Sequence, residues 1–150
     1  MKSKEFENMI VIVDIDNTLC FNNKRYELAT NKSGRVDWDI LYDFTNVLSD
    51  EPNWQIIENV RKYKSRNFKI VIFTSRPESI RVPTEQWLHK YEIPYDVLYM
   101  RSLEDMKISH VELKHKMYRT FIDDKVFCAF DDRQDIVELW LNLGIPTFKV

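Results

Sequence analysis

Residues 9–18 read Met-Ile-Val-Ile-Val-Asp-Ile-Asp-Asn-Thr, and this stretch decides the fold. Its first half is a continuous, mostly β-branched apolar run, which is typical of a strand buried on both faces of a parallel sheet. Its second half places Asp14 and Asp16 at the end of that strand. Side chains two apart on a strand point the same way, so we expect the two carboxylates to converge. The alternative is a plain strand-to-turn junction in which Asp-Asn only makes the turn.

In the rest of the chain, apolar runs typical of buried strands alternate with apolar residues at helical spacing. Runs that suit buried strands lie at residues 69–73, 95–100, 126–130 and 147–150. Helical spacing of apolar residues occurs at residues 54–63, 84–91, 111–121 and 136–143. Such alternation indicates βαβ units. We therefore predict an α/β, Rossmann-like fold with a mainly parallel sheet flanked by helices, in one domain over residues 1–150.

Residues 17–52 interrupt this alternation, because no strand fits between the first strand and its helix. The segment is polar at first and then aromatic, around Trp38 and Tyr42. Long insertions in α/β enzymes often carry function. We expect a small cap over the active site, with one short helix near residues 38–48. A tryptophan such as Trp38 could stack a base, although the core of the cap is its more common place.

Composition narrows the class of protein. The net charge of −2 argues against a broad, non-specific nucleic-acid footprint, which would need a more basic surface. Cys20 and Cys128 lie far apart and lack metal-ligand spacing, so neither a zinc site nor a disulfide framework is expected. The first residues contain no signal-peptide core, and no stretch is long enough for a membrane span. These features favour a cytoplasmic protein with no membrane partner, and nothing indicates a partner protein.

Three more polar groups follow predicted strands or begin a predicted helix. Thr74, Ser75 and Arg76 end the strand at 69–73, where a hydroxyl and backbone N–H groups can hold phosphoryl oxygens. An ordinary Ser/Pro turn is the simpler alternative. In the helix that begins near residue 110, Lys114 or Lys116 could neutralise phosphate charge, or could simply face solvent.

The adjacent acids Asp131 and Asp132 end the strand at 126–130. Acids at a buried strand end are unfavourable unless they meet a cation or hydrogen-bond donors. Oxygen ligands of this kind suit Mg²⁺. Asp132 could instead cap the following helix. Ligands in α/β folds bind beyond the carboxyl ends of strands, which is where all of these groups are expected.

Taken together, the motifs resemble the haloacid dehalogenase (HAD) superfamily of phosphatases. Its four motifs, which are D-x-D-x-T, a Thr/Ser, a Lys and a paired Asp, match this chain in order at Asp14-Ile-Asp16-Asn-Thr18, Thr74, Lys114 and Asp131-Asp132. Asn17 replaces a usual glycine, and it tolerates the left-handed backbone that the turn needs. Ser75 replaces another glycine, and Ser109-His110 stands where an acidic pair is frequent, which bears on substrate choice.

Finer details resemble the 3′-phosphatase domain of bacteriophage-type polynucleotide kinase-phosphatases. They include Arg25, Asp37-Trp38-Asp39, Thr74-Ser75-Arg76-Pro77, Met100-Arg101 with Asp105, and Asp131-Asp132-Arg133. The resemblance implies a Mg²⁺-dependent phosphomonoesterase acting on the 3′-phosphate end of DNA or RNA. Arg25, Ser75, Arg76 and Arg101 are its candidate substrate-binding residues. Arg76 could equally be structural, paired with a nearby acid.

The same resemblance implies a two-step mechanism. Asp14 forms an aspartyl-phosphate, and Asp16 donates and then accepts a proton, which requires Asp16 to have a higher pKa than Asp14. Asp14, the Asp16 carbonyl and Asp131 hold Mg²⁺, with Asp132 orienting Lys114 or a metal-bound water. Thr74 and Lys114 hold the phosphoryl oxygens.

Three alternatives remain open on the sequence. The first is another HAD phosphatase, acting on nucleotides or small phosphorylated metabolites. The second is a receiver-type signalling module phosphorylated on aspartate, which the order of the acids disfavours, because its phosphorylated residue lies on a later strand. The third is a catalytically silent binding module, which the complete set of acids disfavours.

Overall fold

The computed structural model describes residues 7–150. One sheet contains five parallel strands in the order β5-β4-β1-β6-β7. The strands are β1 (Ile10–Val13), β4 (Lys69–Pro77), β5 (Val97–Arg101), β6 (Val126–Asp131) and β7 (Thr147–Lys149). β1 lies in the middle of the sheet, where Val13 pairs with Ile72 of β4 and Phe130 of β6. The predicted α/β fold with a mainly parallel sheet is confirmed.

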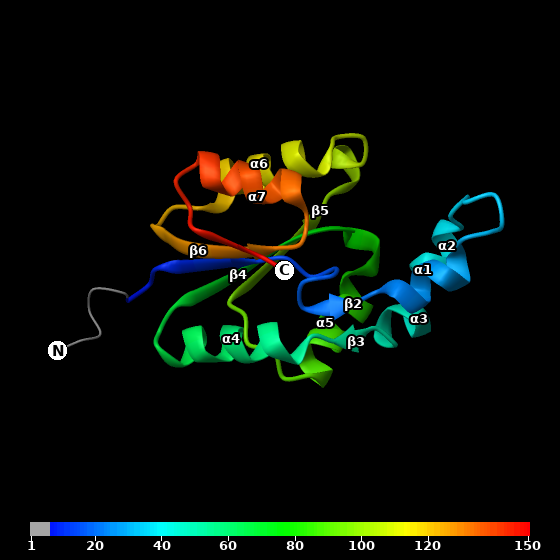
Figure 1. Ribbon diagram of the computed structural model, residues 1–150, viewed down its shortest axis with the longest axis horizontal. Coiled ribbons are helices and arrows are strands. Elements are labelled where there is room, and N and C mark those ends of the chain that lie inside the picture. Colours follow the sequence, from blue (N-terminus) through cyan, green and yellow to red (C-terminus); the bar gives the residue numbers. More distant parts are fainter. Residues whose placement is uncertain (1–6) are drawn as a thin grey trace.

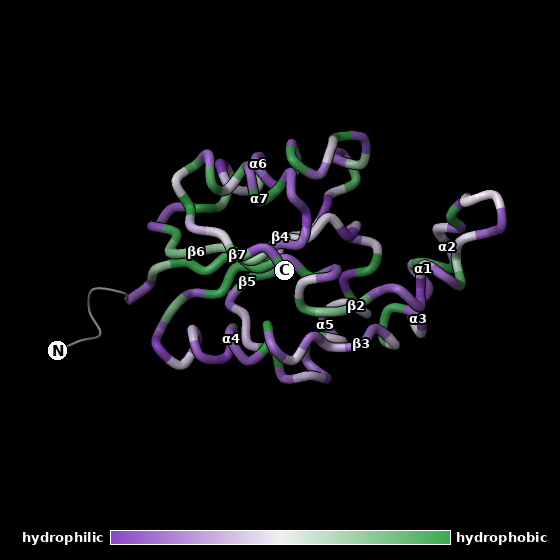
Figure 2. Tube along the Cα trace, viewed as in Figure 1, coloured by the Kyte–Doolittle hydropathy of each residue, from purple (hydrophilic) through white to green (hydrophobic). Residues whose placement is uncertain are grey.

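Helices cover both faces of the sheet (Figure 1). On one face lie α4 (Trp54–Ser65) and α5 (Arg81–Lys90), and on the other lie α6 (His110–Phe121) and α7 (Gln134–Asn142). Alternate residues of β1 serve the two layers. Val11 and Val13 belong to the core that contains Ile57 of α4, whereas Ile12 belongs to the core that contains Trp140 of α7. The apolar strands therefore run through the centre of the molecule, as the hydropathy colouring in Figure 2 shows.

Some helix boundaries differ from the expectation. α5 begins at Arg81 rather than near residue 84, so that Pro83 lies in its first turn. A proline is tolerated there because the first N–H groups of a helix have no partner within the helix. The chain ends α7 near Gly144, whose φ of +79° gives the left-handed backbone common after helices. None of the helices within residues 7–150 is long and apolar enough to cross a lipid bilayer.

The segment between β1 and α4 forms a cap that projects beyond one end of the sheet (Figure 1). Its elements are β2 (Cys20–Phe21), α1 (Asn23–Ala29), α2 (Trp38–Leu41), α3 (Phe44–Leu48) and β3 (Glu51–Pro52). The expectation that this segment contains no strand is wrong, because β2 and β3 pair antiparallel. Strands of two residues carry no readable periodicity.

The expectation of one helix near residues 38–48 is also wrong. Asp37 and Asp43 each accept hydrogen bonds from the N–H groups two and three residues ahead, and each begins its own helix. An N-cap aspartate favours a helix start and has extended backbone itself. Asp43 therefore divides the expected helix into α2 and α3. The helix α1 was not predicted, because its first residues are polar and its apolar face is narrow.

The packing of β4 gives a test of the fold. We expect Ile72→Ala to lower the free energy of unfolding by about 2–5 kcal/mol, because Ile72 is fully buried and its loss leaves a cavity. Val82→Ala on α5 is the control, since Val82 is 59% exposed and its replacement should change stability by no more than about 0.5 kcal/mol. Urea denaturation measures both, and equal effects would contradict the described packing.

Candidate active site

Two side chains from distant parts of the chain, Lys114 and Asp131, lie at the carboxylate of Asp14. Asp14 follows β1 directly and is 7% exposed. Lys114 Nζ donates to Asp14 Oδ1 at 2.9 Å and to Asp131 Oδ2 at 2.6 Å. Thr18 Oγ1 donates to the other carboxylate oxygen of Asp14 at 3.1 Å. The structure thus brings together Asp14, Lys114 and Asp131, as the sequence predicted.

The helix α6 decides which lysine faces the site. Lys114 is 2% exposed and points into the site, whereas Lys116 donates to Asp105 Oδ1 at 2.7 Å on the outside. Residues two apart on a helix project from nearly opposite sides. Lys114 is therefore the lysine of the site, and Lys116 belongs to the surface.

Burial sets the protonation of this cluster. Burial raises the pKa of Asp14 well above its usual range, and the nearby charges of Asp131 and Asp16 add to this effect, against the opposing charge of Lys114. Burial alone would lower the pKa of Lys114, but the two carboxylates raise it above the ordinary value. The ammonium group therefore stays charged and partly neutralises the buried acids.

A third acid completes a set of possible metal ligands. Carboxylate oxygens of Asp14, Asp131 and Asp132 lie within 4.8 Å of one another. Hard oxygen donors at this spacing fit a divalent cation such as Mg²⁺ better than a softer metal. The alternative role of Asp132 as a helix cap is wrong, because α7 has no side-chain cap. Asp131 Oδ1 instead accepts the N–H of Arg133 at 3.1 Å.

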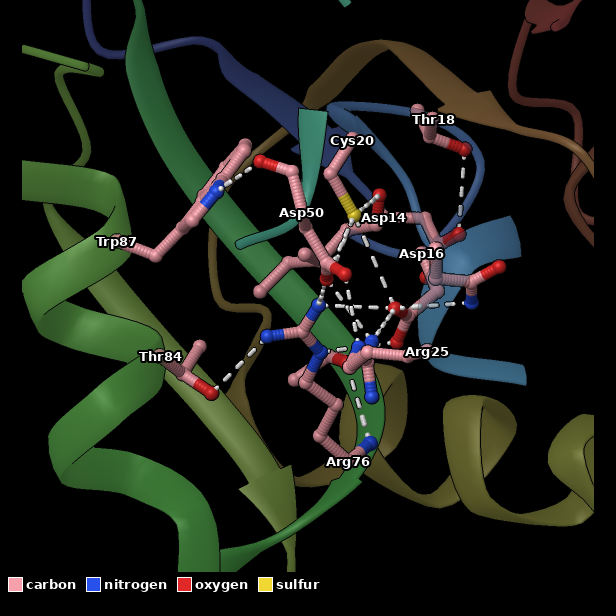
Figure 3. Close-up of polar contacts among 12 residues, drawn as sticks. Asp14, Asp16, Thr18, Cys20, Arg25, Asp50, Arg76, Thr84 and Trp87 are labelled. Carbon is pink, nitrogen blue, oxygen red and sulfur yellow. Dashed lines mark hydrogen bonds and ion pairs between the residues drawn. The ribbon is translucent and has the colours of Figure 1, made fainter. Parts of the chain in front are cut away.

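A second cluster of charges surrounds Asp16 (Figure 3). Arg76 donates to both oxygens of Asp16 at 2.8 and 2.9 Å, and Arg25 donates to Oδ1 at 2.9 Å. Arg25 lies on the cap helix α1, and Arg76 lies near the end of β4. These ion pairs join the cap, the β1 end and β4 at one point.

Asp50 is the counterpart of Asp16 in this cluster. Its carboxylate accepts from Arg25 Nε at 2.8 Å and from Arg76 Nη2 at 3.0 Å, and its side chain is 1% exposed. Its backbone oxygen accepts from Trp87 Nε1 of α5 at 2.9 Å. Two acids and two guanidiniums balance in charge, so this group needs no metal ion. The Sγ atom of Cys20 lies against it, 3.6 Å from Asp50 Oδ2.

The pKa of Asp16 departs from the expectation. Burial alone would raise it, but the guanidiniums of Arg76 and Arg25 together hold the pKa of Asp16 well below its usual range. The expectation that Asp16 has a higher pKa than Asp14 is therefore wrong for this arrangement. The reason is that two buried arginines, Arg25 and Arg76, both donate to Asp16, and the sequence does not show that they share this partner.

The arginines expected to bind substrate all have partners within the protein. Arg25 and Arg76 are each 2% exposed and are engaged as described above, which favours the structural alternative for Arg76. Arg101 Nη1 donates to the backbone oxygens of Asp105 and Ile108 at 2.6 and 2.8 Å. The structure places Arg25 and Arg76 in the wall of the Asp14 pocket, but it does not bring Arg101 there.

Thr74 and Ser75 lie side by side in sequence but face different surroundings. Thr74 is fully buried, and its Oγ1 accepts the N–H of Arg76 at 3.1 Å. Ser75 Oγ lies 2.6 Å from His110 Nδ1, and both residues line the pocket. The turn at Asn17 has a φ of +58°, which confirms the expected left-handed backbone.

Asp14 lines a pocket of about 410 Å³. Its walls come from the acids and the lysine, from Arg25 and Arg76, and from cap residues. The members not named among the expected site residues are Asn17, Asn22, Asn23, Tyr26, Tyr42, His110 and Arg133. Residues of the cap thus form one side of the pocket. What the arrangement offers chemically is a buried carboxylate beside a fixed positive charge.

Comparison with known proteins decides the family. The sequence model of the family described as "Polynucleotide kinase PNKP phosphatase domain" matches residues 8–150. The chain belongs to this phosphatase-domain family. A bifunctional polynucleotide kinase/RNA ligase from Autographa californica nuclear polyhedrosis virus is 33% identical over 142 residues, which is 91% of this chain and 18% of the viral protein.

Solved structures agree with this membership. Two structures of the Pnkp1/Rnl/Hen1 complex contain a chain that is 27% identical, with TM-scores of 0.76 and 0.78 over 100% of this chain. This chain covers 48% and 44% of those chains, so it spans less than half of their length. A phosphatase from Clostridium difficile shares the fold, with a TM-score of 0.67 at 14% identity over 95% of this chain and 85% of its own. The protein is thus a phosphatase domain of the HAD superfamily.

Two residues of the buried charge network, Asp50 and Thr84, could not be assigned to it from the sequence. Asp50 looks like one more acid in a polar insertion, and nothing in its spacing marks it as buried. Thr84 sits inside α5, where its Oγ1 accepts from Arg76 Nη1 at 3.2 Å. Charged residues are rarely buried without a partner. Arg25 and Arg76 indicate that acidic partners are needed if the arginines are buried, but the sequence does not show which acids these are.

Asp50 and its neighbour provide a matched test in the phosphatase domain. We expect Asp50→Ala to lower the free energy of unfolding by about 3 kcal/mol, because two buried guanidiniums lose a partner while Asp16 still faces both. Glu51→Ala removes an ion pair with Lys24 that is 59% and 70% exposed, and should change stability by less than about 1 kcal/mol. Urea denaturation at pH 7 compares them, and a loss for Asp50→Ala no larger than for Glu51→Ala would contradict the buried network.

Proposed function

We propose that this domain is a Mg²⁺-dependent phosphatase that removes a terminal 3′-phosphate from nucleic acid through an aspartyl-phosphate on Asp14. The observation that carries the proposal is the contact of Lys114 Nζ with both Asp14 and Asp131, at 2.9 and 2.6 Å, beside the pocket. It supports the proposal because the carboxylate that would act as nucleophile, the cation that would neutralise phosphate and the acids that would bind metal lie together. Residues 1–150 would act as one domain, with residues 17–52 as its cap.

The donor set of the pocket fits a magnesium ion. The carboxylates of Asp14, Asp131 and Asp132 would hold it, together with the backbone carbonyl of Asp16. When bound, Mg²⁺ supplies positive charge that favours ionised carboxylates and stabilises charge on the phosphoryl group. The geometry supports this assignment, because oxygens of the three carboxylates lie within 4.8 Å of one another and Lys114 brings only one positive charge to them.

The residues of the pocket suit a two-step transfer. An oxygen of Asp14 attacks phosphorus and forms a new P–O bond, while the bond from phosphorus to the leaving oxygen breaks. Lys114 neutralises phosphoryl charge, and Thr18 keeps the other Asp14 oxygen in place through its 3.1 Å hydrogen bond. Water then attacks the aspartyl-phosphate and releases inorganic phosphate and the Asp14 carboxylate.

Asp16 is the proton carrier in this scheme. The arginines favour its ionised form, which suits the second step, where it accepts a proton from water. For the first step it must already hold a proton for the leaving oxygen. The arriving phosphate brings negative charge into the pocket, and nearby negative charge raises the pKa of a carboxyl group. The proposed first step therefore requires that the bound substrate raise the pKa of Asp16 far enough for it to hold a proton.

The substrate class is proposed from the relatives. The similar viral protein is described as a polynucleotide kinase/RNA ligase, and the similar solved chains come from a Pnkp1/Rnl/Hen1 RNA repair complex. A 3′-phosphorylated strand end is the substrate that links a phosphatase to such proteins. The sequence indicated no partner protein, and these relatives lead us to include an end-joining partner in the proposal. A cytoplasmic location belongs to it too, since Cys20 and Cys128 are both free thiols.

Replacement of the nucleophile tests the mechanism. We expect Asp14→Asn to lower kcat by on the order of 10⁴ or more, because the amide cannot attack phosphorus. Asp124→Asn makes the same chemical change at an exposed residue before β6 and should retain full activity. Circular dichroism establishes that both variants fold. Turnover by pure, folded Asp14→Asn at the wild-type rate would disprove the aspartyl-phosphate mechanism.

A substrate comparison with metal removal tests the substrate and the ion. We expect release of phosphate from a 3′-phosphorylated oligonucleotide with a kcat/KM at least about tenfold above that for nucleoside monophosphates, because more of the strand contacts the protein. EDTA should abolish turnover, and excess Mg²⁺ should restore it. Higher kcat/KM on the mononucleotides would instead favour a phosphatase of small metabolites, and unchanged activity in EDTA would remove the metal from the proposal.

A further inference from the structure

A second hollow adjoins the catalytic pocket. It measures about 750 Å³ and lies between the cap and the segment that follows β5. We call it the cap groove, and its lining includes Trp38, Tyr42, Ser75, Leu103, Met106 and His110. Tyr42, Ser75 and His110 also line the pocket of Asp14. The two hollows therefore adjoin, and we call the place where these three residues lie their junction.

The far part of the cap groove exposes large apolar side chains. Trp38 is 56% exposed, Leu103 is 89% exposed and Met106 is 49% exposed. Clusters of this kind on a protein surface usually mark a binding site. Trp38 is thus not the core of the cap, and it lines the cap groove. Its ring centroid lies 5.6 Å from that of Tyr42, with the two rings tilted by 31°.

The cap holds the Trp38 ring in a fixed place. Trp38 is the first residue of α2, whose N-terminus is capped by the carboxylate of Asp37. The end of α2 is tied to the buried charge network, because Arg25 Nη1 donates to the backbone oxygen of Leu41 at 3.0 Å. A preorganised aromatic surface loses little freedom when a ligand binds.

The in-line geometry of the proposed reaction would place the leaving group on the side of the cap groove. In an in-line displacement the leaving oxygen lies opposite the attacking one. Asp14 and Lys114 are buried, whereas Tyr42, Ser75 and His110 are partly exposed at the junction with the cap groove. A leaving group opposite Asp14 would therefore extend from phosphorus toward the more exposed junction. The hydrogen-bonded pair Ser75–His110, at 2.6 Å, offers polar atoms where a sugar would lie.

We propose that the cap groove binds a nucleobase of the strand whose 3′-phosphate lies at Asp14, by stacking on Trp38 against Leu103 and Met106. The inference rests on the proposed function. From Asp14 outward, the protein surface changes from an acidic pocket to a polar junction and then to an apolar groove. This order matches the phosphate, the sugar and the base of a strand end. Aromatic side chains stack on any base, so the site would bind a strand end without reading its sequence. Recognition of the end by stacking also agrees with the net charge of −2, which gives little general attraction to a polyanion.

The test measures the coupling between the base and the tryptophan. The substrates are a 3′-phosphorylated oligonucleotide and the same oligonucleotide with abasic residues in its last two positions. For the wild-type protein with Mg²⁺, we expect kcat/KM to be about 10–100-fold higher on the substrate with bases. Trp38→Ala should reduce this ratio to near one, mainly through KM, and Trp38→Phe should keep most of it. Leu103→Ala should reduce the ratio in the same direction.

Trp54→Ala is the matched control, because Trp54 is 49% exposed on α4, outside the cap groove, and should keep the wild-type ratio. An unchanged ratio in Trp38→Ala, or an equal loss of kcat/KM on both substrates, would overturn the base site while leaving the proposed function intact. If the wild-type protein released no phosphate from either oligonucleotide, the proposed function itself would fail. Thermal unfolding followed by circular dichroism confirms that Trp38→Ala is folded, and Trp38→Phe provides a second, milder variant.

Discussion

The buried ion pairs at the carboxyl edge of the sheet are the constraint on which the rest of the structure depends. A buried carboxylate is strongly unfavourable unless a cation or several donors face it. This phosphatase domain buries Asp14, Asp50 and Asp131 almost completely, with Asp16 beside them. Lys114 forms ion pairs with the acids on one side of this edge, and Arg25 and Arg76 form ion pairs with the acids on the other side. Because the three cations come from α6, the cap and β4, the acids can be accommodated only when these elements are all in place.

The two groups of charges have opposite effects on neighbouring aspartates. Burial raises the pKa of Asp14, and the one cation beside it, Lys114, is shared with Asp131 and only partly opposes this effect. Asp16 faces two guanidiniums, and its pKa is lowered. Only the first group keeps an excess of negative charge, which is the property that attracts a metal ion. The same short stretch of sequence therefore supplies Asp14 to a negatively charged site and Asp16 to a group of ion pairs whose charges balance.

The sequence allowed most of the fold and the centre of the site to be predicted, for a physical reason. Buried parallel strands have apolar runs, and polar residues at their ends share one edge, so Asp14, Lys114 and Asp131 could be grouped before any coordinates. The family resemblance selected Lys114 over Lys116. The elements within the cap could not be predicted, because its strands are too short to show a period and Asp43 divides the expected helix. Asp50 and the pairing of Ser75 with His110 depend on contacts across the fold that no local pattern records.

The antiparallel pair of β2 and β3 forms the stem of the cap, and residues 22–50 between these strands form its head. Cys20 pairs with Pro52 and Phe21 with Glu51, so the chain leaves the sheet and returns to it at adjacent points. Residues 22–50 therefore act as a loop inserted between β1 and α4. The entropic cost of closing a loop depends only weakly on its length. Evolution could therefore lengthen, shorten or exchange the head without shifting the register of the central strands. The part that must be retained is the Arg25–Asp50 pair at the neck, which means that new specificity can arise at the tip while the chemistry beneath it is inherited unchanged.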